Sequence, residues 1–408
     1  MLCNFSDNMM TLWMCFLLCW PALVLGNELK LVHAIFSHKL YAPVQLNSTK
    51  NAADNLPSKL DYRFFLEQTD DMNNTVKMDL YKFGKFLRDK YNLFLGEIYF
   101  PEIMRMRTSE YILSMTSGQL VDAGLWPPAQ AQKWHNTLDW QPVVTDYVPA
   151  ERDTLLLGIL CPSFKHEQEL ILKNMSSTIT KLGYSKIFDS LSDKSRFIIE
   201  KPSDVEVLYS LFETLNINNL PLPDWGKELY TNGSMKNITL FSYDLLSHSI
   251  LQKQLNGGTL LKEIIKDTLA DQINNSKRKL KISLYSGEER NLIGVLQSMG
   301  LWKPHILNSV ESLIFEIYQK SPREQYTVKL NYYNGVGKDT EALTLPGCEE
   351  FCPLDKFQKY LHDIIPTVDE KELCQLNSIH DTGSGASLKE SFNYYLLPII
   401  IIHYLLYL

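Results

Sequence analysis

The stretch Leu31-Val-His-Ala-Ile-Phe-Ser-His-Lys-Leu-Tyr-Ala-Pro43 decides how this chain folds. Its first half, Leu31 to Phe36, is an apolar run with the length and composition of a buried parallel strand. His38 follows at the carboxyl end of that strand, and Pro43 stops the strand from continuing. Open α/β sheets bind ligands at the carboxyl ends of their strands, so the stretch predicts a functional site around His38.

The composition is that of a globular protein. The 408 residues are 45% hydrophobic and 21% charged, which is enough for one large domain or two coupled ones. The net charge of −7 argues against a nucleic-acid-binding surface, because such a surface needs clustered lysine and arginine. We find no internal repeat in the sequence, and we predict no cofactor and no metal site.

The N-terminus has the pattern of a secretory leader. Residues 12–25 form an apolar run that is too short for a comfortable membrane span, and Gly26 follows it. We therefore predict a signal peptide over residues 1–26, although the leader carries Asp7 and no lysine or arginine. A buried N-terminal helix and an uncleaved anchor are the alternatives.

The C-terminus has the layout of a signal for glycolipid (GPI) anchoring. Small residues at 384–387 precede a polar stretch and an apolar tail over residues 394–408, with no basic residue after it. The tail, at about 15 residues, is shorter than the ~20 that a transmembrane helix needs. We expect a polar linker and anchor signal over residues 377–408, which places the protein on the extracellular side of the cell membrane or in the secreted fraction. A short transmembrane tail is the alternative.

Cysteines and glycosylation sequons indicate the same compartment. Four cysteines remain after the leader, and they allow three disulfide connectivities: Cys161, Cys348, Cys352 and Cys374. A local loop between Cys348 and Cys352 is sterically reasonable. Six asparagines stand in Asn-x-Ser/Thr sequons, as expected of a glycoprotein from the secretory pathway: Asn47, Asn73, Asn174, Asn232, Asn237 and Asn274.

The body of the chain alternates between strand patterns and helical patterns. Amphipathic helical spacing occurs over residues 76–95 and 109–123. Strands are expected at 103–106, 153–159, 279–285, 312–318 and 326–333, the last two as antiparallel neighbours. We predict an α/β core built from residues 27–128 and 266–376, interrupted by a mostly helical insertion over residues 129–265.

The first strand and its loop resemble the signature of the histidine acid phosphatases, Phe-Arg-His-Gly-x-Arg-x-Pro. Phe36, His38 and Pro43 match, whereas the two arginines and the glycine are replaced, by Ser37, Tyr41 and Lys39. Further segments are similar to the family in its own order: Arg107 to Glu110, Ala123 to Pro128, Trp140 to Pro149, Cys161-Pro162, and Pro346 to Cys348 with Cys352 to Leu354. The resemblance extends over about residues 28–375.

The resemblance implies a fold and a covalent framework. The fold would be α/β, with a histidine-phosphatase-like core sheet, flanking helices and a mostly helical inserted cap domain. Cys161 would pair with Cys374, and Cys348 with Cys352. Because members of the family often form dimers, a homodimer is also considered.

The resemblance also assigns chemical roles. In this family a neutral histidine attacks the phosphorus, arginines bind the phosphate oxygens, and an aspartate in a His-Asp pair protonates the leaving alcohol. His38 takes the nucleophile position, Arg107 a phosphate-binding position and Glu289 the proton-donor position. The remaining family positions are degenerate: Ser37, Lys39, Tyr41, Leu113 and Glu288.

These replacements predict weak phosphate binding. The site loses two cations and gains Glu288 beside Glu289, where each pair of unit charges about 4 Å apart contributes about 4 kcal/mol at an effective dielectric near 20. We expect Arg107 to pair with one of these glutamates instead of with phosphate.

Two functions follow from these replacements. The first is a cell-surface member of the family with impaired catalysis, a pseudophosphatase-like protein that binds an unidentified ligand. The alternative is an active acid phosphatase that hydrolyses small phosphate monoesters through a phosphohistidine on His38, with Glu289 as proton donor.

Overall fold

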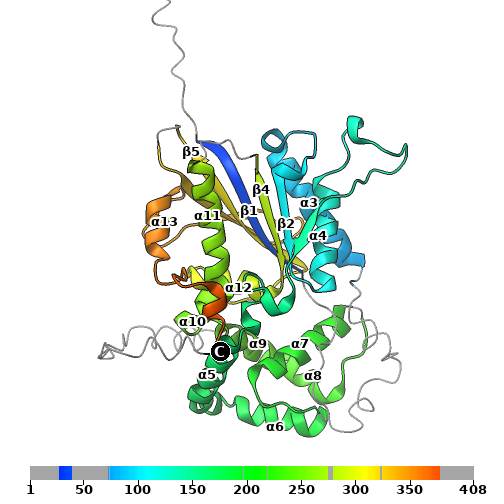
Figure 1. Ribbon diagram of the computed structural model, residues 1–408. Coiled ribbons are helices and arrows are strands. Elements are labelled where there is room, and N and C mark those ends of the chain that lie inside the picture. The colour runs from blue at the N-terminus through cyan, green and yellow to red at the C-terminus, as the bar shows by residue number, and fades with distance from the viewer. Residues whose placement is uncertain are drawn as a thin grey trace, which may run out of the picture.

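A single mixed sheet forms the centre of the computed structural model, which describes residues 27–38, 72, 74–195, 197–217, 219–273, 279–321 and 324–376 (Figure 1). The strand order is β3-β2-β4-β1-β5-β6-β7, and β8 pairs with β6. The strands are β1 Glu28–His38, β2 Met104–Thr108, β3 Thr145–Tyr147, β4 Ile282–Gly287, β5 Val310–Gln319, β6 Thr327–Tyr333, β7 Thr340–Leu343 and β8 Cys352–Pro353. The first four run parallel, and β5 turns antiparallel against β1.

The strand predicted at Leu31 to Phe36 is β1, which lies inside the sheet between β4 and β5. Its side chains alternate between two hydrophobic clusters, so Leu31 and Ile35 face one and Val32, Ala34 and Phe36 the other. A strand buried on both faces is apolar at most of its positions. The apolar run in the sequence is therefore a direct consequence of the central position of β1.

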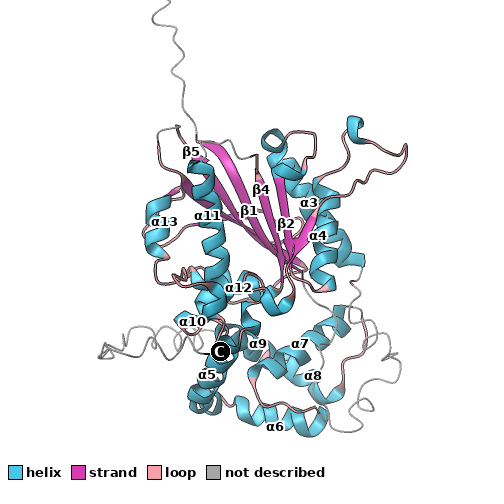
Figure 2. Ribbon diagram, viewed as in Figure 1, coloured by secondary structure: helices cyan, strands magenta, loops and turns pink. Residues whose placement is uncertain are grey.

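Helices cover both faces of the sheet (Figures 1 and 2). Helices α3 Asn74–Leu95 and α4 Ile112–Leu125 pack on one face. Helices α11 Thr259–Ile273, α12 Glu289–Ser298 and α13 Leu354–Tyr360 pack on the other, and α14 Glu370–Leu373 ends the described chain. The resulting α/β architecture, with helices on both sides of a central sheet, confirms the predicted fold class.

A group of helices, here called the cap, lies beyond the carboxyl ends of the parallel strands (Figure 1). The cap consists of α5 Pro162–Lys181, α6 Tyr184–Ser195, α7 Pro202–Ile217, α8 Asp224–Thr231 and α9 Ser234–Asp244, and has its own hydrophobic core. Helix α10 Ile250–Lys253 and a wider turn over Gln254–Gly258 lead back to α11.

The boundaries predicted for the helical insertion, 129 and 265, stay a prediction. Strand β3 falls inside that range yet joins the sheet beside β2, and α11 packs against the core cluster. Short helical turns of the 3-10 type occur at Pro101–Ile103, Gln130–Gln132, Ala150–Arg152 and Gly158–Leu160.

The strand predicted over residues 153–159 is wrong. The segment folds into turns, because the Asp153 carboxylate accepts the backbone N–H of Leu156 at 3.1 Å and Leu157 N–H donates to the Asp153 carbonyl at 2.9 Å. An aspartate that binds the backbone two or three residues onward favours a turn over an extended strand. The apolar composition of the segment reflects burial and not strand structure.

Both disulfides implied by the family resemblance are confirmed. Cys161 is bonded to Cys374 across 213 positions of the sequence, which ties the start of α5 to the end of α14. Cys348 is bonded to Cys352 four positions away. The long-range disulfide fixes the cap to the core.

Several predicted features lie outside the described residues. These are the leader, the segment 377–408, and the sequons at Asn47, Asn73 and Asn274. The other three sequon asparagines are exposed on or beside the cap helices: Asn174, Asn232 and Asn237. No helix in the described part of the chain is long and apolar enough to cross a membrane.

Helices α3 and α4 touch backbone to backbone at Gly84 and Gly124. A Cβ on Gly84 would lie 2.1 Å from the carbonyl oxygen of Val121, and a Cβ on Gly124 would lie 2.1 Å from that of Tyr81. Such distances are far inside van der Waals contact, so only glycine permits this helix pair.

We predict that Gly84→Ala lowers the free energy of unfolding by about 1–3 kcal/mol, because the added methyl forces the helices apart. Urea unfolding followed by circular dichroism measures the effect. The matched control is Lys82→Ala, an exposed position on the same helix, which should leave stability nearly unchanged. Equal stability of the two variants would contradict the close packing.

Candidate active site

Parallel pairing of β1, β4 and β2 brings together residues that are distant in the sequence. Ser37 pairs with Gly287, and Thr108 pairs with Ser286, so the three strands end side by side. We call the residues gathered at these ends the strand-end site: His38, Arg107, Asp153, Glu288 and Glu289. The carboxyl ends of the strands, where the sequence predicts a functional site, therefore carry the candidate site residues.

His38 occupies the last position of β1 and is 1% exposed. Neither ring nitrogen has a hydrogen-bond partner among the described residues. Burial lowers the pKa of His38, and the nearby Glu288 carboxylate opposes that effect only in part. Burial therefore favours the neutral imidazole, which is the form that a nucleophile requires.

Arg107 on β2 is buried and already has an anionic partner. Its Nη2 lies 2.6 Å from Oδ1 of Asp153, whose side chain is fully buried, and its Nη1 donates to the carbonyl oxygen of Thr108. The expected pairing of Arg107 with Glu288 or Glu289 is therefore wrong. The guanidinium charge is balanced inside the protein, which leaves little of it for a bound phosphate.

Glu288 stands at the N-terminus of α12, where it caps the helix. Its side chain accepts the backbone N–H of Asn291, while Asn291 Oδ1 accepts the Glu288 N–H at 2.8 Å. Ser114 of α4 donates to Glu288 Oε1 at 3.5 Å. Helix N-termini attract anions, and at α12 the anion is the Glu288 carboxylate of the chain itself.

Glu289 and the residue after it connect the core to the cap. The buried Tyr243 of α9 donates its hydroxyl to Glu289 Oε2 at 3.2 Å, and burial followed by the charge of Glu289 raises the pKa of Tyr243. Arg290 Nη2 lies 3.0 Å from Oε1 of Glu206 on α7. Polar contacts from two cap helices thus hold the start of α12 in place.

The degenerate family positions differ in their structural surroundings. Ser37 is fully buried on β1, with no hydrogen-bond partner for its hydroxyl among the described residues. Leu113 packs against the cluster shared by α3, α4 and the sheet, where a charged side chain would be unfavourable. Lys39 and Tyr41 lie outside the described residues.

Sequence reasoning missed Glu311, which pairs directly with Ser37 across β1 and β5. Its carboxylate accepts hydrogen bonds from His305 at 2.9 Å, from Asn308 N–H at 2.8 Å and from the Tyr332 hydroxyl. Burial alone would raise the pKa of Glu311, but these hydrogen bonds bring it below its ordinary value. The available signal was a glutamate inside a strand that is otherwise largely apolar.

Asp153 and Tyr243 were also missed, and no pattern in the sequence marks either residue. Each reaches the strand-end site from a segment whose position depends on the tertiary fold: Asp153 from a turn before the cap and Tyr243 from α9. Neither residue belongs to a short motif that would have marked it.

An open pocket of about 470 Å³ lies at the opposite ends of the parallel strands. It is lined by Pro101, Glu102, Met104, Arg105, Val144, Asp146, Lys279 and Leu280. The Arg105 guanidinium is engaged by Glu263 and by the hydroxyl of Tyr285. This pocket contains no residue of the strand-end site, so we assign it no part in the family chemistry.

The chain is similar in sequence to several known proteins over most of its length. The chain is 31% identical over 371 residues to venom acid phosphatase Acph-1 of Apis mellifera, covering 90% of this chain and 94% of that protein. It is 26% identical to lysosomal acid phosphatase of Rattus norvegicus over 306 residues, covering 73% and 70%. It is 28% identical to prostatic acid phosphatase of the same species over 297 residues, covering 70% and 75%. No protein-family model matches the chain.

Solved structures with the same fold include two phytases. Hafnia alvei phytase in complex with tartrate superposes with a TM-score of 0.59 at 16% identity, covering 87% of this chain and 100% of that one. Klebsiella phytase superposes with a TM-score of 0.58 at 13% identity, covering 85% and 99%. These likenesses establish the fold alone.

We predict that Asp153→Asn lowers the free energy of unfolding by about 3–5 kcal/mol, because it leaves the Arg107 guanidinium buried without its counter-charge. Urea unfolding measures the loss. The control is Asp139→Asn, which removes the partner of Lys133 at 2.9 Å from a surface pair and should cost under about 1 kcal/mol. Similar losses in both variants would contradict a charge pair buried at the strand ends.

Proposed function

Given that the chain belongs to the histidine acid phosphatase family, we propose that it is a catalytically impaired member that acts by binding a ligand. One observation carries the proposal. The carboxylate of Glu288 caps α12 beside His38, at the position where the strand ends and the helix N-terminus would otherwise favour an anion. A phosphate ester approaching His38 meets a negative charge there.

The remaining charges support the same conclusion. Arg107 is neutralised by Asp153, and Arg290 by Glu206. A carboxylate about 4 Å from a phosphate charge opposes binding by about 4 kcal/mol per unit charge at an effective dielectric near 20. Phosphoryl transfer depends on positioning and on charge stabilisation of the phosphate oxygens, so a neutral nucleophile alone gives little rate.

The second candidate function is an active acid phosphatase, and the burial of His38, which favours its neutral form, supports it. The neutral ring could attack the phosphorus, and the alcohol would leave with a proton from Glu289. Water would then hydrolyse the phosphohistidine, and Glu289, held by Tyr243, would recover its proton. The relatives compared above carry the name acid phosphatase.

We also propose that the protein is displayed on the extracellular side of the cell membrane through a glycolipid. The support is the sequence layout of residues 377–408 and the secretory features of the chain. Venom and lysosomal relatives agree with passage through the secretory pathway.

Hydrolysis of an aryl phosphate by the full secreted chain, measured across acidic to neutral pH, tests the catalytic part of the proposal. We expect kcat/KM no higher than that of His38→Ala, because Arg107, the arginine of the strand-end site, is already paired with Asp153. Activity that disappears in His38→Ala would instead establish the phosphatase function.

The matched gain-of-function variant restores the family signature: Ser37→Arg, Lys39→Gly, Tyr41→Arg, Glu288→His and Glu289→Asp together. We expect it to bind inorganic phosphate at least about tenfold more tightly than the unchanged chain, since it replaces repulsion by attraction. If phosphate affinity does not rise in the folded variant, the placement of the site is wrong.

Treatment of expressing cells with a phosphatidylinositol-specific phospholipase C tests the anchor. We expect the enzyme to release the protein into the medium, because a glycolipid is the only covalent link that it cleaves. A variant lacking residues 394–408 should be secreted without treatment. Protein that stays on the cells after treatment and still contains its apolar tail would contradict the anchor.

A further inference from the structure

Glu288 combines partial exposure with the absence of a cationic partner. Within the described chain no lysine or arginine lies within ion-pair distance of its carboxylate, and the nearby Arg290 is bound to Glu206. Its hydrogen bonds come from the Asn291 backbone and from Ser114, both of which are neutral donors. The negative charge of Glu288 is thus hydrogen-bonded only by neutral donors, and the charge of Arg290, which is itself paired with Glu206, also acts on it.

His38 provides an independent observation beside it. The pairing of Ser37 with Gly287 places the next residues, His38 and Glu288, at adjacent strand ends. Both ring nitrogens of His38 are buried without a partner among the described residues, although buried polar atoms are nearly always hydrogen-bonded. A neutral imidazole offers one N–H donor and one acceptor nitrogen, and the acceptor can receive an N–H group of a ligand.

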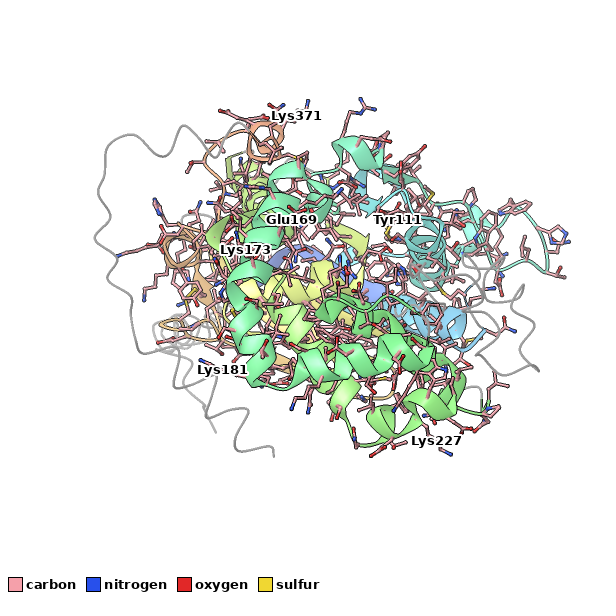
Figure 3. The ribbon with its side chains drawn as sticks, turned by 90° about the horizontal axis from the view of Figure 1, so that it is seen from below. Tyr111, Glu169, Lys173, Lys181, Lys227 and Lys371 are labelled. Atoms are coloured by element: carbon pink, nitrogen blue, oxygen red, sulfur yellow. A yellow bond between two sulfur atoms is a disulfide. The ribbon has the colours of Figure 1, made fainter. Side chains whose placement is uncertain are left out.

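Tyr111 places an aromatic ring beside the strand-end site. It precedes α4 and lies one helical turn from Ser114, the residue that donates to Glu288. Its side chain is 40% exposed, and it is visible from the cap side in Figure 3. Burial, and then the charge of Glu288, raise the pKa of Tyr111, in keeping with the proximity of the two side chains.

We infer that the strand-end site binds a ligand carrying a protonated amine, with Glu288 as counter-charge, His38 as hydrogen-bond acceptor and the Tyr111 ring as a cation–π partner. An ammonium group has three N–H donors and no acceptor, which matches two acceptors and an aromatic face. This inference rests on the proposed function, because it names the class of ligand that the impaired site binds in place of a phosphate ester.

Calorimetric titration of the full secreted chain with phenylethylamine and with its neutral isostere phenylethanol tests the inference. At mildly acidic pH the amine is protonated, and we expect it to bind about tenfold more tightly than the alcohol. Equal affinity of the two probes, or tighter binding of inorganic phosphate than of the amine, overturns the inference.

Two variants test whether Glu288 causes the preference for amine over alcohol. Glu288→Gln keeps an oxygen that can accept the Asn291 N–H, so the helix cap persists while the charge is lost, and the preference for amine over alcohol should vanish. Glu169→Gln, an exposed charge removal on α5 (Figure 3), should leave the preference intact. A preference that survives Glu288→Gln overturns the assignment.

A second variant keeps the test decisive if Glu288→Gln fails to fold. Tyr111→Leu at the exposed rim should weaken amine binding by about two- to fivefold and leave the alcohol affinity nearly unchanged. Unchanged amine affinity in this variant removes Tyr111 from the site and overturns the inference as stated. His38-dependent turnover of aryl phosphate in the same preparations would overturn the proposed function, whereas lack of turnover together with lack of amine preference overturns only the inference.

Discussion

The parallel pairing of β1 with β4 is the constraint on which the rest of the structure depends. Six residue pairs, from Val32 with Ile282 to Ser37 with Gly287, join the start of the described chain to a strand that follows the cap. Because of this register, His38 and Glu288 end adjacent strands and α12 begins beside them. The cap can then reach the strand ends from one side through Tyr243 and Glu206.

On the proposed function, the strand ends keep the framework of a phosphate site whose charges have changed. A neutral nucleophile position, a buried arginine and a helix N-terminus are still present at the strand ends. Each cationic element, however, is satisfied from within the chain: Arg107 by Asp153, and the α12 N-terminus by Glu288. Under the proposed function, this internal compensation favours a ligand other than an anion.

The sequence alone was sufficient to predict the strands whose apolar composition follows from their burial. Strands β1 and β5 were predictable because their largely apolar composition follows from a central place in the sheet. The leucine-rich segment after Asp153 was misassigned as a strand, since buried turns and buried strands share the same composition. Turn formation there depends on a side-chain hydrogen bond that periodicity does not encode.

The candidate site was predictable only in part, for a physical reason. His38 is the last residue of β1 and Glu289 comes two residues after β4, so motif spacing located them. The partner of Arg107 is a carboxylate from a turn, and the carboxylate opposite Ser37 comes from an antiparallel strand. Calorimetric titration of the secreted protein with inorganic phosphate at acidic pH decides between the two functions. An impaired site gives no saturable binding, whereas saturable binding that is lost in His38→Ala establishes a working phosphate site.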